Sequence, residues 1–549
     1  MTAPFPSAVA DPWAADARAK WHIVDASTLD VDTTLDADVV IVGSGAGGGT
    51  AAEILANAGL HVLLVEEGPL KSSRDFNMRE SEAYPQLYQD SAARKTRDKA
   101  INILQGRCVG GGTTVNWTSS FRTPSTTLAY WREHFGLIEF TDATLAPWFA
   151  RMEARLSIAP WEVAPNANNE ALARGARSLG IAAPPIRRNV KGCWNLGYCG
   201  MGCPTNAKQS MLVTTIPAAL AKGATLITRV RAQRFVTRGD RVVALEALAM
   251  NPAGTAPTAR RVTLRATTFI SAAGAIGTPG LLLRSRLPDP LALIGRRTFL
   301  HPSVVSAAAM PEVIDGFAGA PQTIYSDHFL NTQPVDAAIG YKLEAPPLHP
   351  ILTAITLSED GEMHARSMRE FRNLQVVIAL LRDGFHADSP GGTVHLRDDG
   401  TPVLDYPLTP YLWDGVRRAF MAMAEIQFAA GAKTVRPIHG TGFEFTSLAQ
   451  ARAAIARFDL APITTRVVSA HVMGGAPLGP DPRHAVVNVE GRHHLLRNLH
   501  VMDGSLFPTS IGANPQLSIY ALAARLASGL AETLRPATAA IKSQSRALV

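Results

Sequence analysis

The spacing of apolar residues changes along this chain and predicts its elements. Apolar residues run almost without interruption through "ADVVIV" (37–42) and "HVLLVEEG" (61–68), as in strands that are buried on both faces. Between these runs, "GSGAGGG" leads into the helical pattern of "TAAEILANAG" (50–59). This order of strand, helix and strand predicts a βαβ unit.

Later segments predict antiparallel strands and then a return to buried ones. Residues 224–247 alternate in the manner of antiparallel strands, and residues 266–285 indicate a buried strand, a loop and a short helix. Residues 311–465 are more polar and contain weaker motifs, whereas the C-terminal segment is again dense in motifs. We therefore expect one cofactor domain assembled from distant segments, with a second domain inserted between them.

A glycine-rich turn follows the first of these strands. Gly43, Gly45 and Gly48 form GxGxxG at the start of the predicted helix, and Glu66 ends the next strand. In a dinucleotide-binding unit the three glycines allow a tight turn, the close approach of a pyrophosphate, and close packing of helix on strand. The helix N-terminus would face the phosphates, and Glu66 would accept hydrogen bonds from a ribose. The pattern predicts a dinucleotide without distinguishing FAD from NAD.

Composition and charge narrow the class of protein. The 549 residues are 46% apolar and 18% charged, which suits a globular protein with a large core. The net charge is +7, but the basic residues are dispersed, so we expect no nucleic-acid partner; peripheral association with a membrane surface stays open. The sequence contains neither a transmembrane run of about 18 apolar residues nor a recognisable secretory signal, which predicts a cytoplasmic location.

Four segments are similar to the glucose–methanol–choline (GMC) flavoprotein oxidoreductases. They are "GRCVGGGTTVNW" (106–117), "GAIGTPGLLLRS" (274–285), "HVMGGAPLG" (471–479) and "LHVMDGSLFPTSIGANPQLSIYALAARLA" (499–527), in the family's order. The resemblance implies FAD as the cofactor. It also implies an α/β fold, in which a Rossmann-type FAD-binding domain is built from discontinuous segments and a substrate domain has an antiparallel sheet and helices.

This resemblance divides the chain into segments. The FAD-binding domain would comprise residues 30–160, 211–310 and 465–549, the last with the active-site residues. Residues 161–210 would form a linker that contains a cysteine cluster, and residues 311–464 the substrate-binding domain.

The resemblance also implies roles for single residues around the cofactor. Gly110, Gly111 and Asn116 should line the flavin, and Asp503 and Gly504 should lie by its pyrophosphate or ribityl chain. The segment after Asn116 lacks the histidine to which some members bond the flavin, which implies noncovalent FAD.

Two residues near the C-terminus carry the implied chemistry. His471 falls at the family's active-site histidine, and an imidazole with a pKa of about 6.5 can take a proton from an alcohol. Asn514 falls at the second active-site position, where its amide would hold the substrate oxygen; helix capping, worth about 1 kcal/mol, is the alternative. We expect the helix to begin at Pro515 and to aim its free N–H groups at the reduced flavin. His301, in "FLHPS", is predicted to be structural.

Three of the four cysteines lie close together in "GCWNLGYCGMGCPTNAKQS". Cys193, Cys199 and Cys203 have the spacing C-x5-C-x3-C, which resembles a three-iron cluster site in some membrane-linked bacterial sugar dehydrogenases of the family. A similar segment occurs in long-chain alcohol oxidases, for which we assume no cluster. A structural thiol loop, a disulfide and a 3Fe-4S cluster all stay open.

The implied activity is oxidation of an alcohol to an aldehyde or ketone, with proton abstraction by His471 and hydride transfer to flavin N5. The C-terminal segment most resembles the long-chain alcohol oxidase branch, close to choline dehydrogenase-like members, so we expect an apolar or aromatic primary alcohol. The electron acceptor would be oxygen, a quinone or a carrier protein. Two other activities stay open: a hydroxynitrile lyase that contains FAD, and a sugar or polyol dehydrogenase that passes electrons through an iron–sulfur cluster.

Overall fold

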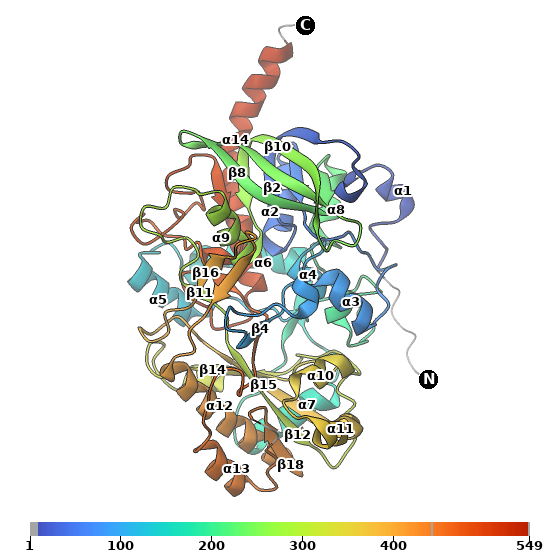
Figure 1. Ribbon diagram of the computed structural model, residues 1–549, viewed down its shortest axis with the longest axis vertical. Coiled ribbons are helices and arrows are strands. Elements are labelled where there is room, and N and C mark those ends of the chain that lie inside the picture. Colours follow the sequence, from blue (N-terminus) through green and yellow to red (C-terminus); the bar gives the residue numbers. More distant parts are fainter. Residues whose placement is uncertain (1–8, 441–442, 547–549) are drawn as a thin grey trace.

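Strands from distant parts of the chain build the first sheet of the computed structural model, which describes residues 9–440 and 443–546, with side chains as far as Arg535. The sheet lies in the upper part of Figure 1. In spatial order its strands are β1 (His22–Asp25), β7 (Thr225–Thr228), β3 (Val62–Val65), β2 (Thr33–Val42), β10 (Pro257–Ser271), β9 (Arg241–Met250) and β8 (Val230–Arg238), and β21 (Leu499–Val501) also pairs with β10.

The predicted βαβ unit lies in the middle of this sheet. β2 and β3 run parallel, and α2 (Ala46–Asn57) connects them. β10 runs parallel to β2 and to β21, which brings the C-terminal segment beside the N-terminal one. β9 and β8 continue the sheet as antiparallel strands, as the alternation of residues 224–247 predicts, whereas β7 at the start of that segment pairs in parallel with β1 and β3.

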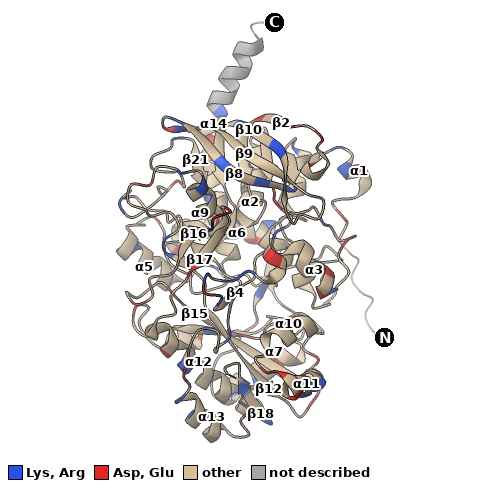
Figure 2. Cartoon of the chain, in the orientation of Figure 1, with Lys and Arg blue, Asp and Glu red and all other residues tan. Residues whose placement is uncertain are grey.

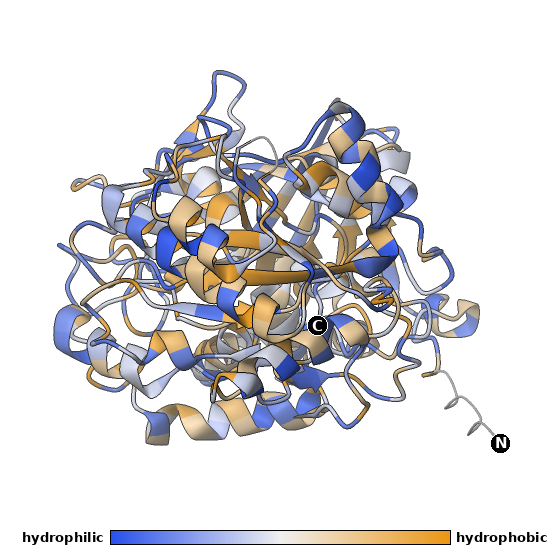
Figure 3. Cartoon of the chain, turned by 90° about the horizontal axis from the view of Figure 1, so that it is seen from below, coloured by the Kyte–Doolittle hydropathy of each residue, from blue (hydrophilic) through white to orange (hydrophobic). Residues whose placement is uncertain are grey.

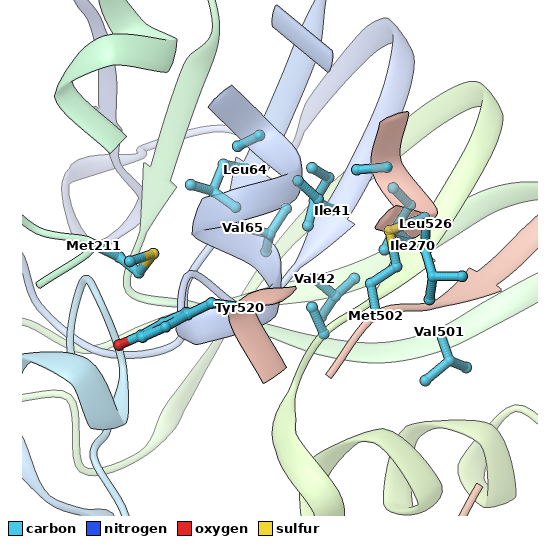
Figure 4. Close-up of a cluster of buried hydrophobic side chains, with 14 of the residues drawn as sticks. Ile41, Val42, Leu64, Val65, Met211, Ile270, Val501, Met502, Tyr520 and Leu526 are labelled. Atoms are coloured by element: carbon cyan, nitrogen blue, oxygen red, sulfur yellow. The ribbon is translucent and has the colours of Figure 1, made fainter. Parts of the chain in front are cut away.

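Buried apolar side chains join this sheet to the C-terminal helix α14 (Gln516–Arg546). Figure 4 shows Ile41, Val65 and Ile270 of β2, β3 and β10 in one cluster with Tyr520 and Leu526 of α14. Full burial of each such aliphatic side chain contributes about 1.5–3 kcal/mol. The cluster therefore stabilises a single domain made from the two ends of the chain. The helices α8 (Thr215–Ala221) and α6 (Asp142–Arg155) pack against α2 and α14 respectively.

The second sheet lies below the first in Figure 1 and is mostly antiparallel. In spatial order its strands are β13 (Tyr325–Ser326), β14 (Tyr341–Glu344), β15 (Leu374–Leu381), β12 (Ser303–Ala309), β19 (Val467–Ser469) and β4 (Ile101–Ile103), and β18 (Thr434–Pro437) also pairs with β12. β19 and β4 pair in parallel.

Alternate residues of this second sheet face different surroundings. Val304, Val377 and Ala379 belong to a core that they share with α12 (Pro410–Ala429) and α7 (Ala167–Ser178). The intervening Val305 and Ile378 line a cavity on the opposite face. Because successive side chains of a strand alternate between its faces, the sheet separates the core of this domain from the cavity. Figure 3 shows apolar strands in the interior, with hydrophilic residues on the outward faces of the helices.

The long helix α12 begins where the sequence provides a cap. The side chain of Thr409 accepts a hydrogen bond from the N–H of Leu412, and Pro410 occupies the first turn. Such a cap satisfies a backbone donor that has no partner within the helix. The helix is thereby placed across the sheet, where it buries one of its faces.

Strand membership differs from the predicted segments at both domains. β1 precedes residue 30 yet belongs to the first sheet. β4, β12 and β19 lie in segments assigned to the FAD-binding domain but form part of the second sheet. α7, within the predicted linker, packs in the core of the second domain. The chain thus crosses between the two domains more often than its motifs indicate.

Charged residues are dispersed over both domains. Figure 2 shows Lys and Arg interspersed with Asp and Glu, without a large area of one sign in this view. Among the described residues, no helix combines the length and the apolar character that crossing a bilayer requires.

Candidate active site

A cavity of about 1400 Å³ lies between the two sheets. The GxGxxG loop, the segment around residues 111–119, and residues 503–504 and 514–516 form its wall on the side of the first domain. The free face of the second sheet forms the opposite wall. Ligands of open α/β sheets bind beyond the carboxyl ends of the strands, where this cavity begins.

The GxGxxG loop is closed toward the protein and open toward the cavity. Gly43 has φ +99°, and a Cβ there would lie 2.3 Å from the carbonyl oxygen of Ala272. A Cβ on Gly48 would lie 1.8 Å from the carbonyl oxygen of Gly43, so α2 can pack this closely only with glycine. Among the described residues, a Cβ on Gly45 would meet nothing closer than 3.9 Å, and one on Gly112 nothing within 4 Å. This cradle fits the close approach of a pyrophosphate.

Two buried carboxylates also face the cavity. Glu66 accepts hydrogen bonds from the N–H of Gly68 (2.9 Å) and the N–H of Ser44 (3.2 Å). Asp503 accepts from the N–H of Gly274 (2.8 Å) and also from Thr278 and Ser505. Burial raises the pKa of both carboxyl groups, and these donors oppose the increase. The bonds hold each carboxylate at the cavity wall, where the hydroxyl groups of a ribose or ribityl chain could reach it.

The second glycine-rich segment contributes to the same wall. Gly111 and Asn116 line the cavity, whereas Gly110 stands behind them and donates its N–H to Ser44 Oγ over 3.0 Å. Asn116 donates to Gln516 Oε1 over 2.7 Å, so its amide is bonded to the first residue of α14. The sequence did not point to Gln516, which connects the loop of Asn116 to the C-terminal helix.

His471 lies just after β19 and lines the cavity. Its Nδ1 is 3.4 Å from Nδ1 of His301, and His301 Nε2 accepts the N–H of Gly512 over 3.0 Å. His301, which we predicted to be structural, therefore contacts both His471 and the backbone of Gly512. Burial and then the positive charge of Lys342 lower the pKa of His471 to about 3, so the imidazole is neutral at ordinary pH.

Asn514 lines the cavity next to the start of α14. Its side-chain amide bonds to Lys342 and Glu344 of β14 and not, among the described bonds, to a backbone N–H of the helix. The capping alternative therefore has no support in this geometry. No sequence motif marks Lys342 or Glu344.

The helix α14 begins at Gln516, one residue after the predicted Pro515. The N–H of Ile519 donates to the carbonyl oxygen of Pro515 over 3.0 Å, which closes the first turn. Pro515, Gln516 and Ile519 all line the cavity. The N-terminal N–H groups and the positive end of the helix dipole are thus directed to the cavity, where they favour a negatively charged group.

The three clustered cysteines are free thiols. Their sulfur atoms have separate partners: Asn195 N–H for Cys193, Arg188 for Cys199, and Lys208 N–H for Cys203. In the part of the chain that the structure describes, no three His, Cys, Asp or Glu side chains are grouped to hold a metal ion. The iron–sulfur alternative is therefore not supported, and the structural thiol loop is the interpretation that fits.

A buried lysine attaches this cysteine loop to the glycine-rich segment that precedes Asn116. Lys208 Nζ donates to the carbonyl oxygens of Thr114 (2.6 Å), Cys199 (2.7 Å) and Asn116 (2.9 Å). Burial lowers the pKa of Lys208 to about 8. The loop thereby supports the segment that carries Asn116.

Apolar side chains cover the part of the cavity that lies over the second sheet. Val305, Ile378 and Leu380 line one side, and Leu352 and Ile355 of α10 (Pro350–Thr356) line the other. This part can bury an apolar ligand next to His471 and Asn514.

Comparison with known proteins identifies the family. GMC oxidoreductase models match residues 84–303, for the N-terminal part, and residues 388–523, for the C-terminal part. The "Uncharacterized GMC-type oxidoreductase Rv0492c" of Mycobacterium tuberculosis is 30% identical over 524 residues, which cover 93% of this chain and 80% of that protein. The chain therefore belongs to the GMC oxidoreductase family, and the predicted fold class is confirmed.

Two further proteins show how the similarity extends. The long-chain-alcohol oxidase FAO4B of Arabidopsis thaliana is 28% identical over 527 residues, which cover 91% of this chain and 68% of that protein. Among solved structures, pyridoxine 4-oxidase from Mesorbium loti has the same fold, with a TM-score of 0.65, 18% identity, and coverage of 89% of this chain and 98% of that one. Membership of the family makes this protein an FAD-dependent oxidoreductase.

Proposed function

We propose that this protein oxidises an apolar primary alcohol to the aldehyde, with noncovalent FAD as the cofactor. The observation that carries the proposal is the position of His471 and Asn514, which line one cavity with the glycine cradle and the apolar face of the second sheet. The similarity to a long-chain-alcohol oxidase supports the same substrate class.

The cradle residues would hold the cofactor. Gly45 and Gly112 leave space for the pyrophosphate, and Glu66 and Asp503 would accept hydrogen bonds from hydroxyl groups of the bound molecule. The free N–H groups at the start of α14 would lie near its negative charge. When bound, FAD accepts the hydride that leaves the carbinol carbon.

The side chains of the chain itself handle the proton and the oxygen. His471 is neutral at ordinary pH and can take the hydroxyl proton. Asn514 can donate from Nδ2 to the same oxygen as negative charge develops on it. One such donor is worth about 2.7–4 kcal/mol in comparable sites. The surrounding apolar side chains exclude water and bury the rest of the substrate.

Molecular oxygen is the proposed electron acceptor, because the curated relatives with alcohol substrates are oxidases. An anaerobic test separates reduction of the flavin by the alcohol from reoxidation of the flavin by oxygen. The holoenzyme is mixed without oxygen with ethanol, hexanol and dodecanol, and the visible absorption of oxidised flavin is followed. We expect bleaching that is fastest with the longer alcohols, and recovery with release of hydrogen peroxide when air is admitted. A flavin that stays oxidised with every alcohol while a cyanohydrin is cleaved would instead indicate the lyase.

A further inference from the structure

Two oppositely charged side chains are buried behind Asn514. Lys342 and Glu344 are alternate residues of β14, and their side chains are 3% and 0% exposed. Across the sheet they pair with Leu380 and Ile378, which both line the cavity. The two charges therefore stand on the cavity side of the second sheet. Charged side chains are almost never buried this completely unless they are paired.

The amide of Asn514 lies between these two charges. Lys342 Nζ donates to Asn514 Oδ1 over 3.4 Å, and Asn514 Nδ2 donates to Glu344 Oε2 over 3.3 Å. Because an ammonium group only donates and a carboxylate only accepts, the amide fits in one of its two orientations. One Nδ2 hydrogen is bound to Glu344, and the second is left for a group in the cavity that Asn514 lines.

Neighbouring side chains fix both charges. Lys342 Nζ lies 2.9 Å from the ring centroid of Phe121 and 4.4 Å from that of Tyr325, as in a cation–π cage. Glu344 accepts a hydrogen bond from Gln322 Nε2, and its Oε1 lies 3.6 Å from Lys342 Nζ. These contacts restrict both chains to the positions in which they meet the amide.

Stability alone does not explain why the pair is present. Taking two charges out of water costs several kcal/mol for each ion, and well-packed apolar residues often replace a buried ion pair without loss of stability. A pair that also bonds both ends of an active-site amide has a second use, which apolar residues could not supply.

We propose that Lys342 and Glu344 are positioning residues for the oxidation: they orient the amide of Asn514 so that an N–H, and not the carbonyl oxygen, faces the substrate hydroxyl. The inference rests on the proposed function, because it assigns a task in that reaction. A reversed amide would direct its oxygen at the position where negative charge develops, and would oppose the reaction. Asn514 itself remains the residue that contacts the substrate.

The charge of Lys342 makes this arrangement sensitive to pH. Glu344 and Asp327 stabilise the ammonium, but burial lowers the pKa of Lys342 to about 8. The same ammonium lowers the pKa of His471 and of His301. As pH rises through about 8, Lys342 loses its proton. The neutral amine can accept as well as donate a hydrogen bond, so it no longer fixes the orientation of the amide.

A double-mutant cycle on the holoenzyme tests whether Lys342 acts through Asn514. Lys342→Met and Asn514→Ala should each slow anaerobic flavin reduction by about 10²-fold, and the double variant should be no slower than Asn514→Ala. The wild-type rate should fall as pH rises through about 8, and Lys342→Met should lack this decrease. Independent, multiplying effects with an unchanged pH profile would overturn the proposal. Tyr341→Phe, on the core face of the same strand, is the control and should react at the wild-type rate.

A second measurement does not depend on turnover. With 15N-labelled asparagine, the side-chain NH₂ signals of Asn514, assigned by their loss in Asn514→Asp, should be separate and slow to exchange with solvent in wild type and Tyr341→Phe. Lys342→Met should accelerate their exchange at least about tenfold, since the amide can then rotate. Unchanged protection would refute the positioning role. If no alcohol reduces the wild-type flavin, the proposed function fails, while this exchange experiment still decides the orientation of the amide.

Discussion

The two walls of the cavity are built in different ways. The wall on the side of the first sheet is formed by backbone, where Gly43 and Gly48 pack against carbonyl oxygens and Gly45 stays open to the ligand. The wall on the side of the second sheet is formed largely by apolar side chains, and the buried Lys342 and Glu344 lie behind Asn514. A wall made of backbone suits a ligand that is common to a family. A wall made of side chains can differ between members that act on different substrates.

Two buried lysines show the same difference. Among the described bonds, the side chain of Lys208 donates to backbone carbonyl oxygens, those of Thr114, Asn116 and Cys199. Lys342 bonds to the side chain of Asn514 and lies next to Glu344. We infer that loss of Lys208 destabilises the wall beside the first sheet and weakens FAD binding. Loss of Lys342 should slow the reaction while the second sheet stays folded.

The largest effect on stability is expected at Gly48, where the backbone of α2 packs against the backbone of the GxGxxG loop. Gly48→Ala places a methyl group 1.8 Å from the carbonyl oxygen of Gly43, so the loop and α2 must separate. We expect a destabilisation of about 3 kcal/mol, at the upper end of overpacking costs, and loss of FAD. Thermal unfolding and the flavin-to-protein absorbance ratio measure both. Gly112→Ala is the control, because its methyl group enters only the cavity: it should unfold like the wild-type apoprotein yet bind FAD more weakly. Full FAD content in Gly48→Ala would show that the loop is not closed as described.

The next effect concerns chemistry without loss of the cofactor. His471→Ala should keep its flavin and its melting temperature but reduce the rate of flavin reduction by about 10²–10⁴-fold, as removal of a general base does. Anaerobic stopped-flow mixing with a saturating alcohol measures the rate. A rate equal to that of the wild type would remove His471 from the reaction.

The same histidine predicts the acid side of the pH profile. A base acts when it is unprotonated, and the pKa of His471 is lowered to about 3, so its active form persists well below the ordinary value of 6.5. We expect no decrease in flavin reduction as pH falls through 6.5. A decrease centred there, abolished by a change at His471, would mean that the imidazole is far more accessible to water than its burial indicates.

The sequence predicted the cavity wall beside the first sheet better than the wall beside the second sheet, for a physical reason. GxGxxG indicates a tight turn that depends on local backbone conformation, and the continuous apolar runs beside it are typical of buried parallel strands. Both signals are local, and the predicted βαβ unit is confirmed. "YKLE" alternates like a strand with one face in water, but Phe121, Tyr325 and Asn514, from other parts of the chain, cover that face. The contact between His301 and His471 has no signature in the sequence for the same reason, because the tertiary fold brings the two residues together.

The boundaries between the two domains also depend on pairing between strands that lie far apart in the sequence. β12 lies within residues 211–310, which the resemblance assigns to the FAD-binding domain, yet it pairs with β15, which lies much later in the chain. Likewise, the spacing of the three cysteines resembled a cluster site, but spacing does not determine the directions of the side chains, and the folded loop gives each sulfur a different partner.

A smaller effect compares the two lysines directly. Lys208→Met removes the donor of three buried carbonyl oxygens, and unsatisfied buried groups of this kind cost about 1–3 kcal/mol. We expect a lower free energy of unfolding and weaker FAD retention, measured by urea unfolding and by FAD release on dilution. Lys342→Met is the matched control, and it should retain FAD like the wild type. Equal FAD loss in both variants would contradict the division of roles between the two walls.

The smallest effect is expected at the rim of the apolar wall. Ile355 lines the cavity yet is 55% exposed, so it can cover only the far end of a long substrate. Ile355→Ser should remove about 0.5–1 kcal/mol of apolar contact, which raises KM for dodecanol about two- to fivefold and leaves KM for ethanol unchanged. Ile138→Ser is the control, since Ile138 is 76% exposed and lies away from the cavity, and it should change neither value. Steady-state oxygen consumption with both alcohols measures the difference. If Ile355→Ser alters KM for ethanol and dodecanol equally, α10 does not follow the substrate chain, and the apolar wall ends nearer to His471.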